Sequence, residues 1–350
     1  MVQKGFVVDC GVGESSTSGR KPNALTIENQ HNFIVVASWH KTYISMALVS
    51  PTGNILFSEK QTIESDREYV QLTVSLFNHC VSMHTESNGR VLGFCLVVPS
   101  LVDEYKKEII STVLSLHGEN VLSCLRSAIP DCPIVVLNDT ACYAYAELGF
   151  SELEQEVFAF ININKGVGAV LVDHGRILRK ANGMTTQFGH FSVDRHGPVC
   201  SCGNRGCLEC LIGETALSRR AKQLGISEIF PRPDRILFSD VGGLCIAGNP
   251  IAAQFMRMLA EDMAFGLSNL ISLYNPQQII IGGTGIGLGE VFLQELNWHL
   301  GQMGYPAFVR HVQIRFSNLS KESELQGAAQ YYVDKYLSFD EEMHSQVFIG

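Results

Sequence analysis

The sequence has few charged residues and no excess of positive charge. Only 17% of the 350 residues are charged, and the formal net charge is −9 at pH 7. Such a chain offers no broad cationic surface to the phosphates of a nucleic acid, so any contact with DNA must be local. The composition therefore excludes a protein that binds nucleic acid along its whole body.

Long apolar runs are also missing. The apolar stretches have the length of single strands, whereas a membrane helix needs about 20 apolar residues in succession. The first ten residues hold one lysine and no apolar segment followed by a cleavage site, which does not fit a secretory signal peptide. We therefore expect a cytoplasmic protein without membrane insertion.

The cysteines do not indicate a disulfide framework. Eleven cysteines, an odd number, in a chain of this length indicate free thiols and metal ligands. Cys95 and Cys142 stand among apolar neighbours, so they are predicted to be buried thiols.

The sequence does contain enough apolar residues, 46%, for two lobes, because single cores stop growing near about 250 to 300 residues. A meander of three strands precedes a helical pattern over residues 69–81 and a buried strand over residues 91–98. The second half repeats the strand, turn, strand opening at residues 157–172. It ends with helical patterns over residues 252–273 and 324–336. Strands that alternate with helices predict an α/β protein with two lobes and a cleft between them.

The first thirty residues follow a different pattern. Two short strand patterns, residues 6–8 and 24–27, enclose a loop rich in glycine and serine that ends in Arg20 and Lys21. This arrangement predicts a β-hairpin with a basic tip.

The segment of residues 200–207 predicts a metal site. It places Cys200, Cys202 and Cys207 within eight residues, and its glycines allow tight backbone turns. His190 stands ten residues earlier and supplies a fourth ligand. Three cysteines and one histidine leave no open position, which is typical of structural zinc rather than catalytic zinc. The alternatives are buried thiols beside a core histidine, or a redox pair formed by Cys200 and Cys202.

The pattern of His190, the three cysteines and Glu209 resembles the ROK family, which comprises bacterial repressors and sugar kinases. The resemblance covers nearly the whole chain and includes residues 98–103, 138–139, 166–168, 189–190 and 281–283. It implies an α/β, actin/hexokinase-like (ribonuclease H-like) fold with two lobes, a central cleft and a structural zinc loop.

The resemblance also divides the chain. Residues 1–31 are predicted to be the remnant of a winged-helix wing with its linker, and residues 32–137 the N-terminal lobe. Residues 138–321 are predicted to form the C-terminal lobe with the zinc loop. A helix over about residues 322–337 packs back on the first lobe, and residues 338–350 are a polar tail.

In kinases of this family an Asn-Asp pair holds sugar hydroxyls, and its Asp is the general base that activates the attacking hydroxyl toward ATP. The resemblance gives these positions to Asn138 and Asp139, and it assigns further hydroxyls to Gln187, His190 and Glu209. His190 then serves both zinc and sugar. From the residues alone, Asn138 and Asp139 fit a helix N-cap equally well.

Both phosphate-binding turns of the kinases are altered. The first turn, which carries a magnesium-organising Asp and two glycines in the kinases, reads Ala-Ser-Trp-His-Lys-Thr over residues 37–42. It has neither glycine nor carboxylate, and Trp39 is bulky enough to fill the place of a phosphate. Gln187 stands where the kinases have a glutamate that contacts the sugar. The second turn, usually Gly-Thr-Gly-x-Gly in the kinases, reads Asn-Lys-Gly-Val-Gly over residues 164–168 and keeps only its later glycines, Gly166 and Gly168. Gly282 and Gly283 are the other glycines that remain from the nucleotide loops.

We therefore predict a sugar-responsive transcriptional regulator of the NagC/Mlc-like repressor type, with a hexose or N-acetylhexosamine in the cleft and a degraded kinase site. Residues 5–22 resemble the wing of the winged helix-turn-helix in that branch, so Arg20 and Lys21 are predicted to contact DNA phosphates or a minor groove. The recognition helices that precede the wing in that branch do not stand before it here. Either the start at Met1 is late, or autonomous operator binding has been lost.

Two alternatives remain open. The first is an ATP-dependent ROK sugar kinase for glucose or an N-acetylhexosamine, with Asp139 as general base and with ATP and magnesium as cofactors. The second is a sugar-binding protein without DNA contact that answers to a sugar-transport protein. The resemblance implies a homodimer or homotetramer in each case.

Overall fold

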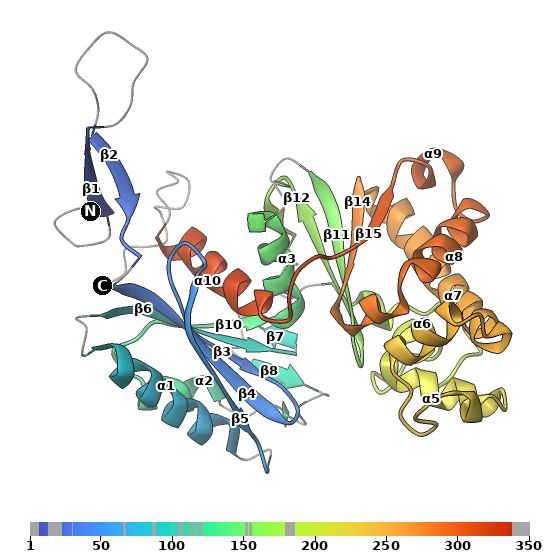
Figure 1. The fold of residues 1–350 in the computed structure, drawn as a ribbon, viewed down its shortest axis with the longest axis horizontal. Coiled ribbons are helices and arrows are strands. Elements are labelled where there is room, and N and C mark those ends of the chain that lie inside the picture. Colours follow the sequence, from blue (N-terminus) through green and yellow to red (C-terminus); the bar gives the residue numbers. More distant parts are fainter. Residues whose placement is uncertain are drawn as a thin grey trace, which may run out of the picture. The chain divides into compact units, whose positions relative to one another are not determined.

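The computed structural model divides the chain into two compact units. Unit 1 comprises residues 1–149 and 322–350, and unit 2 comprises residues 150–321 (Figure 1). The structure describes residues 7–12, 23–29, 31–65, 68–85, 89–99, 101–103, 108–111, 114, 116–117, 121–150, 153, 156–178 and 186–337.

A mixed five-stranded sheet forms the centre of unit 1. Its strands are β3 (Asn32–Trp39), β4 (Tyr43–Val49), β5 (Ile55–Thr62), β6 (Arg90–Val98) and β10 (Ile134–Asn138). The spatial order is β10-β6-β3-β4-β5. β3, β4 and β5 pair as an antiparallel meander, as predicted, and β6 and β10 extend the sheet in parallel.

Helices cover both faces of this sheet (Figure 1). They are α1 (Tyr69–Thr85), α2 (Val121–Ala128), α3 (Asp139–Phe150) and α10 (Ser323–Tyr336). Successive side chains of a strand point to opposite faces. Val35 of β3 therefore joins the core under α1 and α2, whereas Val36 joins the core under α3 and α10. Every residue of β3 is buried, which explains its continuous apolar run.

The contact between α3 and α10 is close. A Cβ atom on Gly327 of α10 would lie 1.9 Å from the backbone carbonyl oxygen of Cys142 in α3. The Tyr332 hydroxyl donates a hydrogen bond to the Leu92 carbonyl oxygen of β6 at 2.7 Å. These contacts join α3 to α10 and α10 to β6. Unit 1 includes residues 138–149, which the sequence analysis placed in the second lobe. Cys95 and Cys142 are buried in this core, as predicted.

Two small sheets complete unit 1. The first pairs β1 (Val7–Val12) with β2 (Asn23–Ile27) in antiparallel fashion, with Val7 opposite Ile27. These strands form the N-terminal hairpin that the sequence predicts, and Arg20 and Lys21 lie outside the described residues. The second sheet contains β7 (Leu101–Asp103), β8 (Glu108–Ser111) and β9 (Leu116–His117).

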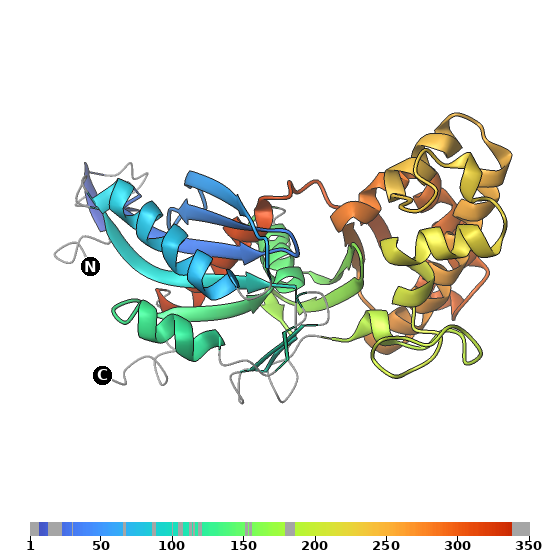
Figure 2. The same cartoon turned by 90° about the horizontal axis from the view of Figure 1, so that it is seen from below.

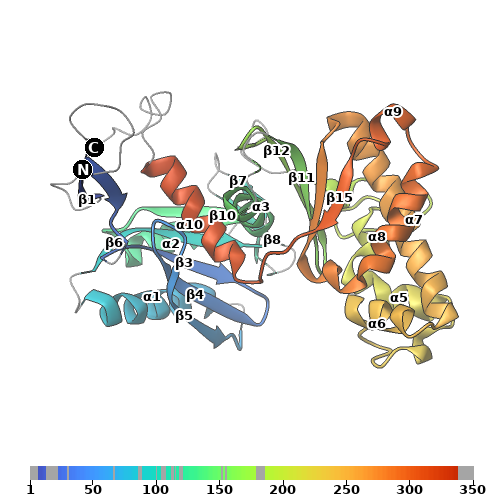
Figure 3. The ribbon, with the colours of Figure 1, turned by 45° about the horizontal axis from the view of Figure 1, so that its top comes forward.

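Unit 2 is built on a second five-stranded sheet, in the order β13-β12-β11-β14-β15. The strands are β11 (Val157–Ile163), β12 (Val167–Asp173), β13 (Arg176–Ile177), β14 (Gln278–Gly282) and β15 (Gln313–Phe316). Its helices are α4 (Glu209–Ile212), α5 (Glu214–Gln223), α6 (Phe238–Ile246), α7 (Pro250–Tyr274), α8 (Glu290–Gly301) and α9 (Pro306–Val309), with 3-10 turns η3 (Phe188–His190), η4 (Ser227–Ile229) and η5 (Gly283–Leu288). Figures 2 and 3 show α7 and α8 beside this sheet. These two sheets with their helices confirm the predicted α/β architecture.

The long helix α7 has clear local start and stop signals. The Asn249 side chain accepts hydrogen bonds from the backbone N–H groups of Ile251 and Ala252, and Pro250 occupies the first turn. Asn275 ends the helix in the left-handed conformation, with φ of 49°. No helix in the described part of the chain is long and apolar enough to cross a membrane.

The substitution Gly327→Ala is expected to destabilise unit 1 by about 2 kcal/mol or more, because the new methyl group collides with a backbone carbonyl of α3. Urea unfolding followed by tryptophan emission measures this change, since Trp39 is completely buried in unit 1. Gly149→Ala in α3 is the control, because a Cβ there meets nothing within 4 Å. Equal midpoints for the two variants would contradict the close packing of α3 and α10.

Candidate functional site

The predicted metal ligands lie on a tightly folded loop of unit 2. His190 ends η3, and the loop continues through Cys200 and Cys202 to Cys207, just before α4. Gly206 has a φ of 59°, and a Cβ there would lie 1.7 Å from the carbonyl oxygen of Asp194. Glycine is therefore required at this turn, because a side chain has neither the space nor the backbone conformation.

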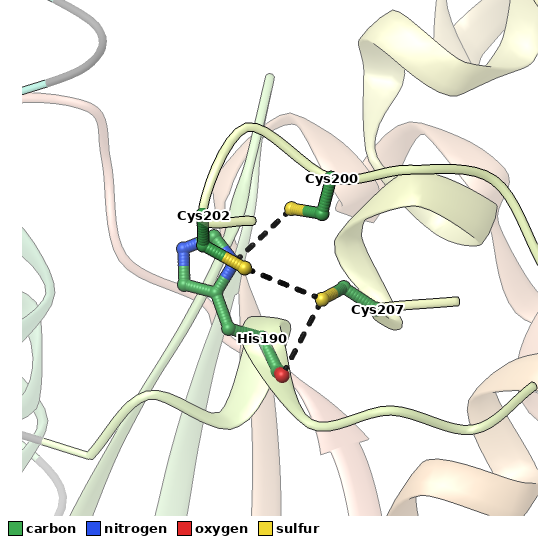
Figure 4. Close-up of side chains that lie close together, drawn as sticks. All are labelled: His190, Cys200, Cys202 and Cys207. Carbon is green, nitrogen blue, oxygen red and sulfur yellow. Dashed lines mark hydrogen bonds between the residues drawn. The ribbon is translucent and has the colours of Figure 1, made fainter. Parts of the chain in front are cut away.

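The structure brings all four ligands together (Figure 4). Their ligand atoms lie within 4.8 Å of one another. The Sγ atoms of Cys202 and Cys207 are 3.6 Å apart, and Cys200 Sγ lies 3.5 Å from His190 Nδ1. A tetrahedral zinc ion with ordinary bond lengths separates two sulfurs by about 3.8 Å and sulfur from nitrogen by about 3.5 Å. The geometry therefore fits a zinc ion bound by three thiolates and one imidazole.

The same geometry sets the direction of the histidine ring. Because Nδ1 of His190 faces the thiols, Nε2 points to another side and carries the ring proton when Nδ1 binds a metal. Cys200 and Cys207 are buried, with exposed fractions of 4% and 0%, whereas Cys202 is exposed. A centre with four protein ligands has no open position, so its chemistry is structural.

The metal cluster lies between the segments that carry the predicted sugar residues of unit 2. The Leu208 N–H donates to the Phe191 carbonyl oxygen at 3.0 Å, which places the segment after His190 beside the segment before Glu209. Gln187 is exposed, and its Nε2 donates to the Thr186 carbonyl oxygen at 3.3 Å.

Glu209 has a fixed position at the start of α4. Its Oε2 accepts the backbone N–H of Val167 at 3.0 Å, and a Cβ on Gly166 would lie 2.4 Å from the same oxygen. Gly166 therefore gives this carboxylate access to the turn between β11 and β12. Gly168, which was predicted with it, lies in β12 opposite Asn162.

The remaining predicted sugar residues, Asn138 and Asp139, lie in unit 1. Asn138 Oδ1 accepts the backbone N–H of Ala141 at 3.2 Å, so this atom caps α3. Asp139 Oδ1 accepts the Thr140 N–H at 2.7 Å. Burial and, to a smaller extent, Glu324 raise the pKa of Asp139, the Thr140 hydrogen bonds and His40 lower it, and the net result is a pKa of about 6. A carboxyl group with this pKa is ionised at neutral pH and can accept hydroxyl protons.

Sequence reasoning did not select His40 or Glu324. His40 Nε2 lies 3.2 Å from Glu324 Oε1 and 3.2 Å from Ser38 Oγ. His40 stands in the turn where the kinases have glycines that bind phosphate, and this difference is visible in the sequence. Glu324 gives no such signal, because only the fold brings α10 to the end of β3.

The role assigned to Trp39 is wrong. Its ring is completely buried under α1, where Nε1 donates to Thr73 Oγ1 at 2.8 Å and the ring contacts that of Tyr69. Successive side chains of β3 alternate between the two faces of the sheet, and Trp39 is the last residue of β3 on the face that α1 covers. The side chain that replaces a turn glycine and meets polar partners is His40.

The other altered phosphate turn is closed by an asparagine. Asn164 Oδ1 accepts the backbone N–H of Thr284 at 2.7 Å, and its Nδ2 donates to Asn162 Oδ1 at 2.9 Å. Gly283 has a φ of 78°, and a Cβ there would meet both asparagine side chains, while a Cβ on Gly282 would meet the Phe160 ring. The Thr284 amide, at a loop where a nucleotide phosphate would bind in a kinase, is thus already satisfied within the protein.

The substitution Cys207→Ser is expected to reduce bound zinc from one ion per chain to near none and to destabilise unit 2 by about 2 kcal/mol or more. Elemental analysis of the dialysed protein measures the metal, and thermal unfolding measures stability. Cys245→Ser in α6 is the matched control, because Cys245 lies outside the cluster. Stoichiometric zinc in Cys207→Ser would contradict the assignment.

Known proteins show the same architecture. The sequence is 26% identical to the xylose repressor of Caldicellulosiruptor bescii, with 97% of this chain and 88% of that protein covered. The fold matches a crystal structure described as a ROK family transcriptional regulator, a homologue of the Escherichia coli Mlc protein, with a TM-score of 0.80, 22% identity and coverage of 94% and 85%. It also matches a ROK family glucokinase of Streptomyces griseus in complex with glucose and AMPPNP, with a TM-score of 0.70, 22% identity and coverage of 85% and 98%.

The family assignment follows from these matches and from the metal cluster. The ROK family profile matches residues 40–335, which include β4, all four metal ligands and α10 except its last residue. The resemblance stated on the cysteine and histidine pattern is thereby confirmed, and the chain belongs to the ROK family.

Proposed function

We propose that the protein is a sugar-responsive transcriptional repressor whose kinase site has decayed. The observation that carries this proposal is the similarity to the xylose repressor, which extends over 97% of the chain. The N-terminal β1–β2 hairpin, which kinases do not require, supports the same branch. Regulation here means that a bound sugar changes the affinity for operator DNA.

We propose that the ligand is a neutral sugar. Carboxylates such as those of Asp139 and Glu209 accept hydrogen bonds from hydroxyls, and amides such as those of Asn138 and Gln187 both donate and accept them. His190 would contribute Nε2, with its ring held by zinc through Nδ1. We propose a hexose or an N-acetylhexosamine, and the name of the relative adds D-xylose to the candidates.

Two local structures argue against phosphoryl transfer. His40 Nε2 contacts the Glu324 carboxyl group at 3.2 Å at one altered turn, and Asn164 Oδ1 accepts the Thr284 N–H at the other. Transfer of a phosphoryl group depends on backbone amides and a magnesium carboxylate that hold the phosphates. The turn at residues 37–42 contains neither glycine nor carboxylate, and the Thr284 N–H is already hydrogen-bonded to Asn164. Few groups therefore remain that could bind the phosphates of ATP. The kinase therefore remains the second candidate, supported by the similarity of the fold to the glucokinase and by Asp139.

The remaining parts of the proposal concern partners. Arg20 and Lys21, which stand between β1 and β2 in the sequence, would contact the phosphates or minor groove of operator DNA, in a cytoplasmic homodimer or homotetramer. A sugar-transport protein is an alternative effector. The chain carries a formal net charge of −9, so DNA contact has to come from such a local element.

Calorimetric titration with D-glucose, N-acetyl-D-glucosamine, N-acetyl-D-mannosamine and D-xylose tests the sugar site. At least one sugar is expected to bind, and Asp139→Asn is expected to weaken it by about tenfold or more, because a charged acceptor is lost. Asp131→Asn, at an exposed residue before β10, is the control. Heat on titration with ATP and magnesium, or ADP release with any sugar, would favour the kinase instead.

Selection of duplexes from a random DNA pool, with and without the bound sugar, tests the repressor. Retained sequences are expected to be released by the sugar. The double substitution of Arg20 and Lys21 by alanine is expected to weaken binding uniformly across sequences and to reduce the slope of log K against log salt by roughly 2. An unchanged slope would remove these residues from the interface, and a chain that retains no DNA would favour the sugar-binding alternative.

A further inference from the structure

The three cysteines of the metal cluster differ in their access to solvent. Cys202 is exposed, whereas Cys200 and Cys207 have exposed fractions of 4% and 0%. Cys202 lies in the turn that the Cys200 N–H closes by donating to the Asn204 carbonyl oxygen at 2.8 Å. A Cβ on Gly203, the next residue of this turn, would meet nothing within 4 Å, so the turn borders open space. A dissolved reagent can therefore reach Cys202, and the other two cysteines are shielded.

Cys202 also has a second sulfur within reach. Its Sγ lies 3.6 Å from the Sγ of Cys207 (Figure 4). A disulfide bond is about 2 Å long, so the two sulfurs need to approach by roughly 1.5 Å. The sulfur of Cys200 lies beside His190 Nδ1 instead, at 3.5 Å. Cys207 is therefore the partner that the geometry offers to Cys202.

Cysteines that respond to oxidants share three properties, which are thiolate character, exposure to solvent and a neighbouring cysteine that resolves the oxidised sulfur. Cys202 has the exposure and the neighbour. Zinc supplies the third property when it is bound, because a cysteine that ligates a metal is a thiolate. The three properties thus meet at one residue of the cluster.

We propose that Cys202 is a peroxide-reactive site with Cys207 as its resolving cysteine. The Cys202 thiolate attacks one oxygen of the peroxide, the O–O bond breaks, and a sulfenic acid and a hydroxide ion form. The Cys207 thiolate then attacks the sulfenic sulfur, so that the S–S bond forms and a second hydroxide ion leaves. Two thiolates together lose two electrons, and one hydrogen peroxide is reduced to two hydroxide ions, which take up protons from the solvent.

This oxidation removes two of the four metal ligands. His190 and Cys200 remain, and two ligands do not hold a structural zinc ion, so the ion is released. The His190 ring then loses the partner that fixes its direction, and the loop that leads to Glu209 loses its cross-link. Oxidation is therefore expected to weaken sugar binding, and this consequence, unlike the oxidation itself, rests on the proposed function.

Peroxide titration of the zinc-loaded full chain tests the reactive site. A chromogenic chelator measures released zinc, and alkylation followed by mass spectrometry of the digest identifies the disulfide. About one zinc ion per chain is expected to leave as about one equivalent of hydrogen peroxide is consumed, with Cys202 joined to Cys207. Cys124 of α2 is the internal control, because it is exposed but lies outside the cluster. It is expected to stay open to alkylation at the same peroxide concentration.

The substitution Cys202→His separates oxidation from a general weakness of the loop. An imidazole can replace the thiolate as the fourth zinc ligand, and the exposed position leaves room for the ring. This variant is expected to keep its zinc at peroxide concentrations that empty the wild type. Where the variant does not hold zinc, the disulfide map of the wild type decides.

Calorimetry with the panel sugar that the reduced chain binds most tightly tests the consequence for the ligand site. The oxidised chain is expected to bind it about tenfold or more weakly, and reduction with dithiothreitol in the presence of zinc is expected to restore the affinity.

Each outcome decides a different claim. Zinc that stays bound in the peroxide-treated wild type, a disulfide between other cysteines, or equal zinc release from the wild type and zinc-loaded Cys202→His would overturn the reactive site. An unchanged sugar affinity after oxidation would overturn its link to the ligand. A reduced chain that binds no panel sugar would overturn the proposed function and leave the reactive site standing.

Discussion

The architecture of unit 1 depends on the close approach of α3 and α10. These helices meet where Gly327 faces the Cys142 carbonyl, at a separation that no larger residue permits. Because α10 comes from the end of the described chain, this contact closes the first sheet with a segment that follows unit 2 in sequence. It also sets the position of Glu324, which lies three residues before Gly327 on α10, beside His40. The packing of one glycine thus holds this buried carboxyl group in place.

The metal cluster has the corresponding role in unit 2. The segment between η3 and α4 contains little regular secondary structure, and few of its backbone groups pair in a ladder. Such a segment loses much conformational entropy on folding and buries little apolar surface in return. Four ligands on one zinc ion would offset that loss and hold the segments that carry His190 and Glu209 together. Gly166 leaves room for the Glu209 carboxylate to accept a hydrogen bond from the Val167 N–H. The metal loop, which positions Glu209, thereby also fixes a contact with the turn between β11 and β12.

The sequence predicts the parts of this protein that depend on local patterns. The meander, the buried β6, the amphipathic α7 and the ligand spacing of residues 190–207 all carry period or spacing signals, and the structure contains each of them. The wrong or missing predictions have one cause. The direction of a side chain and its contacts with residues far away in the sequence cannot be read from a local sequence pattern. Trp39 was placed by its size, but strand alternation turns it into the core. Glu324 was invisible, because its partners lie on β3 and α3. Asn138 fitted both a cap and a sugar contact, and its Oδ1 is indeed used as a cap.

Under the proposed function, the two altered turns would let the chain bind a sugar without a nucleotide. In a phosphoryl-transfer enzyme, magnesium and the nucleotide arrive together and supply the charge balance of the reacting state. A sensor has to bind its ligand without that partner. Residues 37–42 lack the glycines and the carboxylate of the kinase turn, and the Asn164–Thr284 hydrogen bond removes an amide that would otherwise favour an anion. A ligand shifts a conformational equilibrium only through its different affinities for the two states. Removing the need for ATP makes the sugar alone the source of that difference, which is what a repressor that responds to sugar concentration requires.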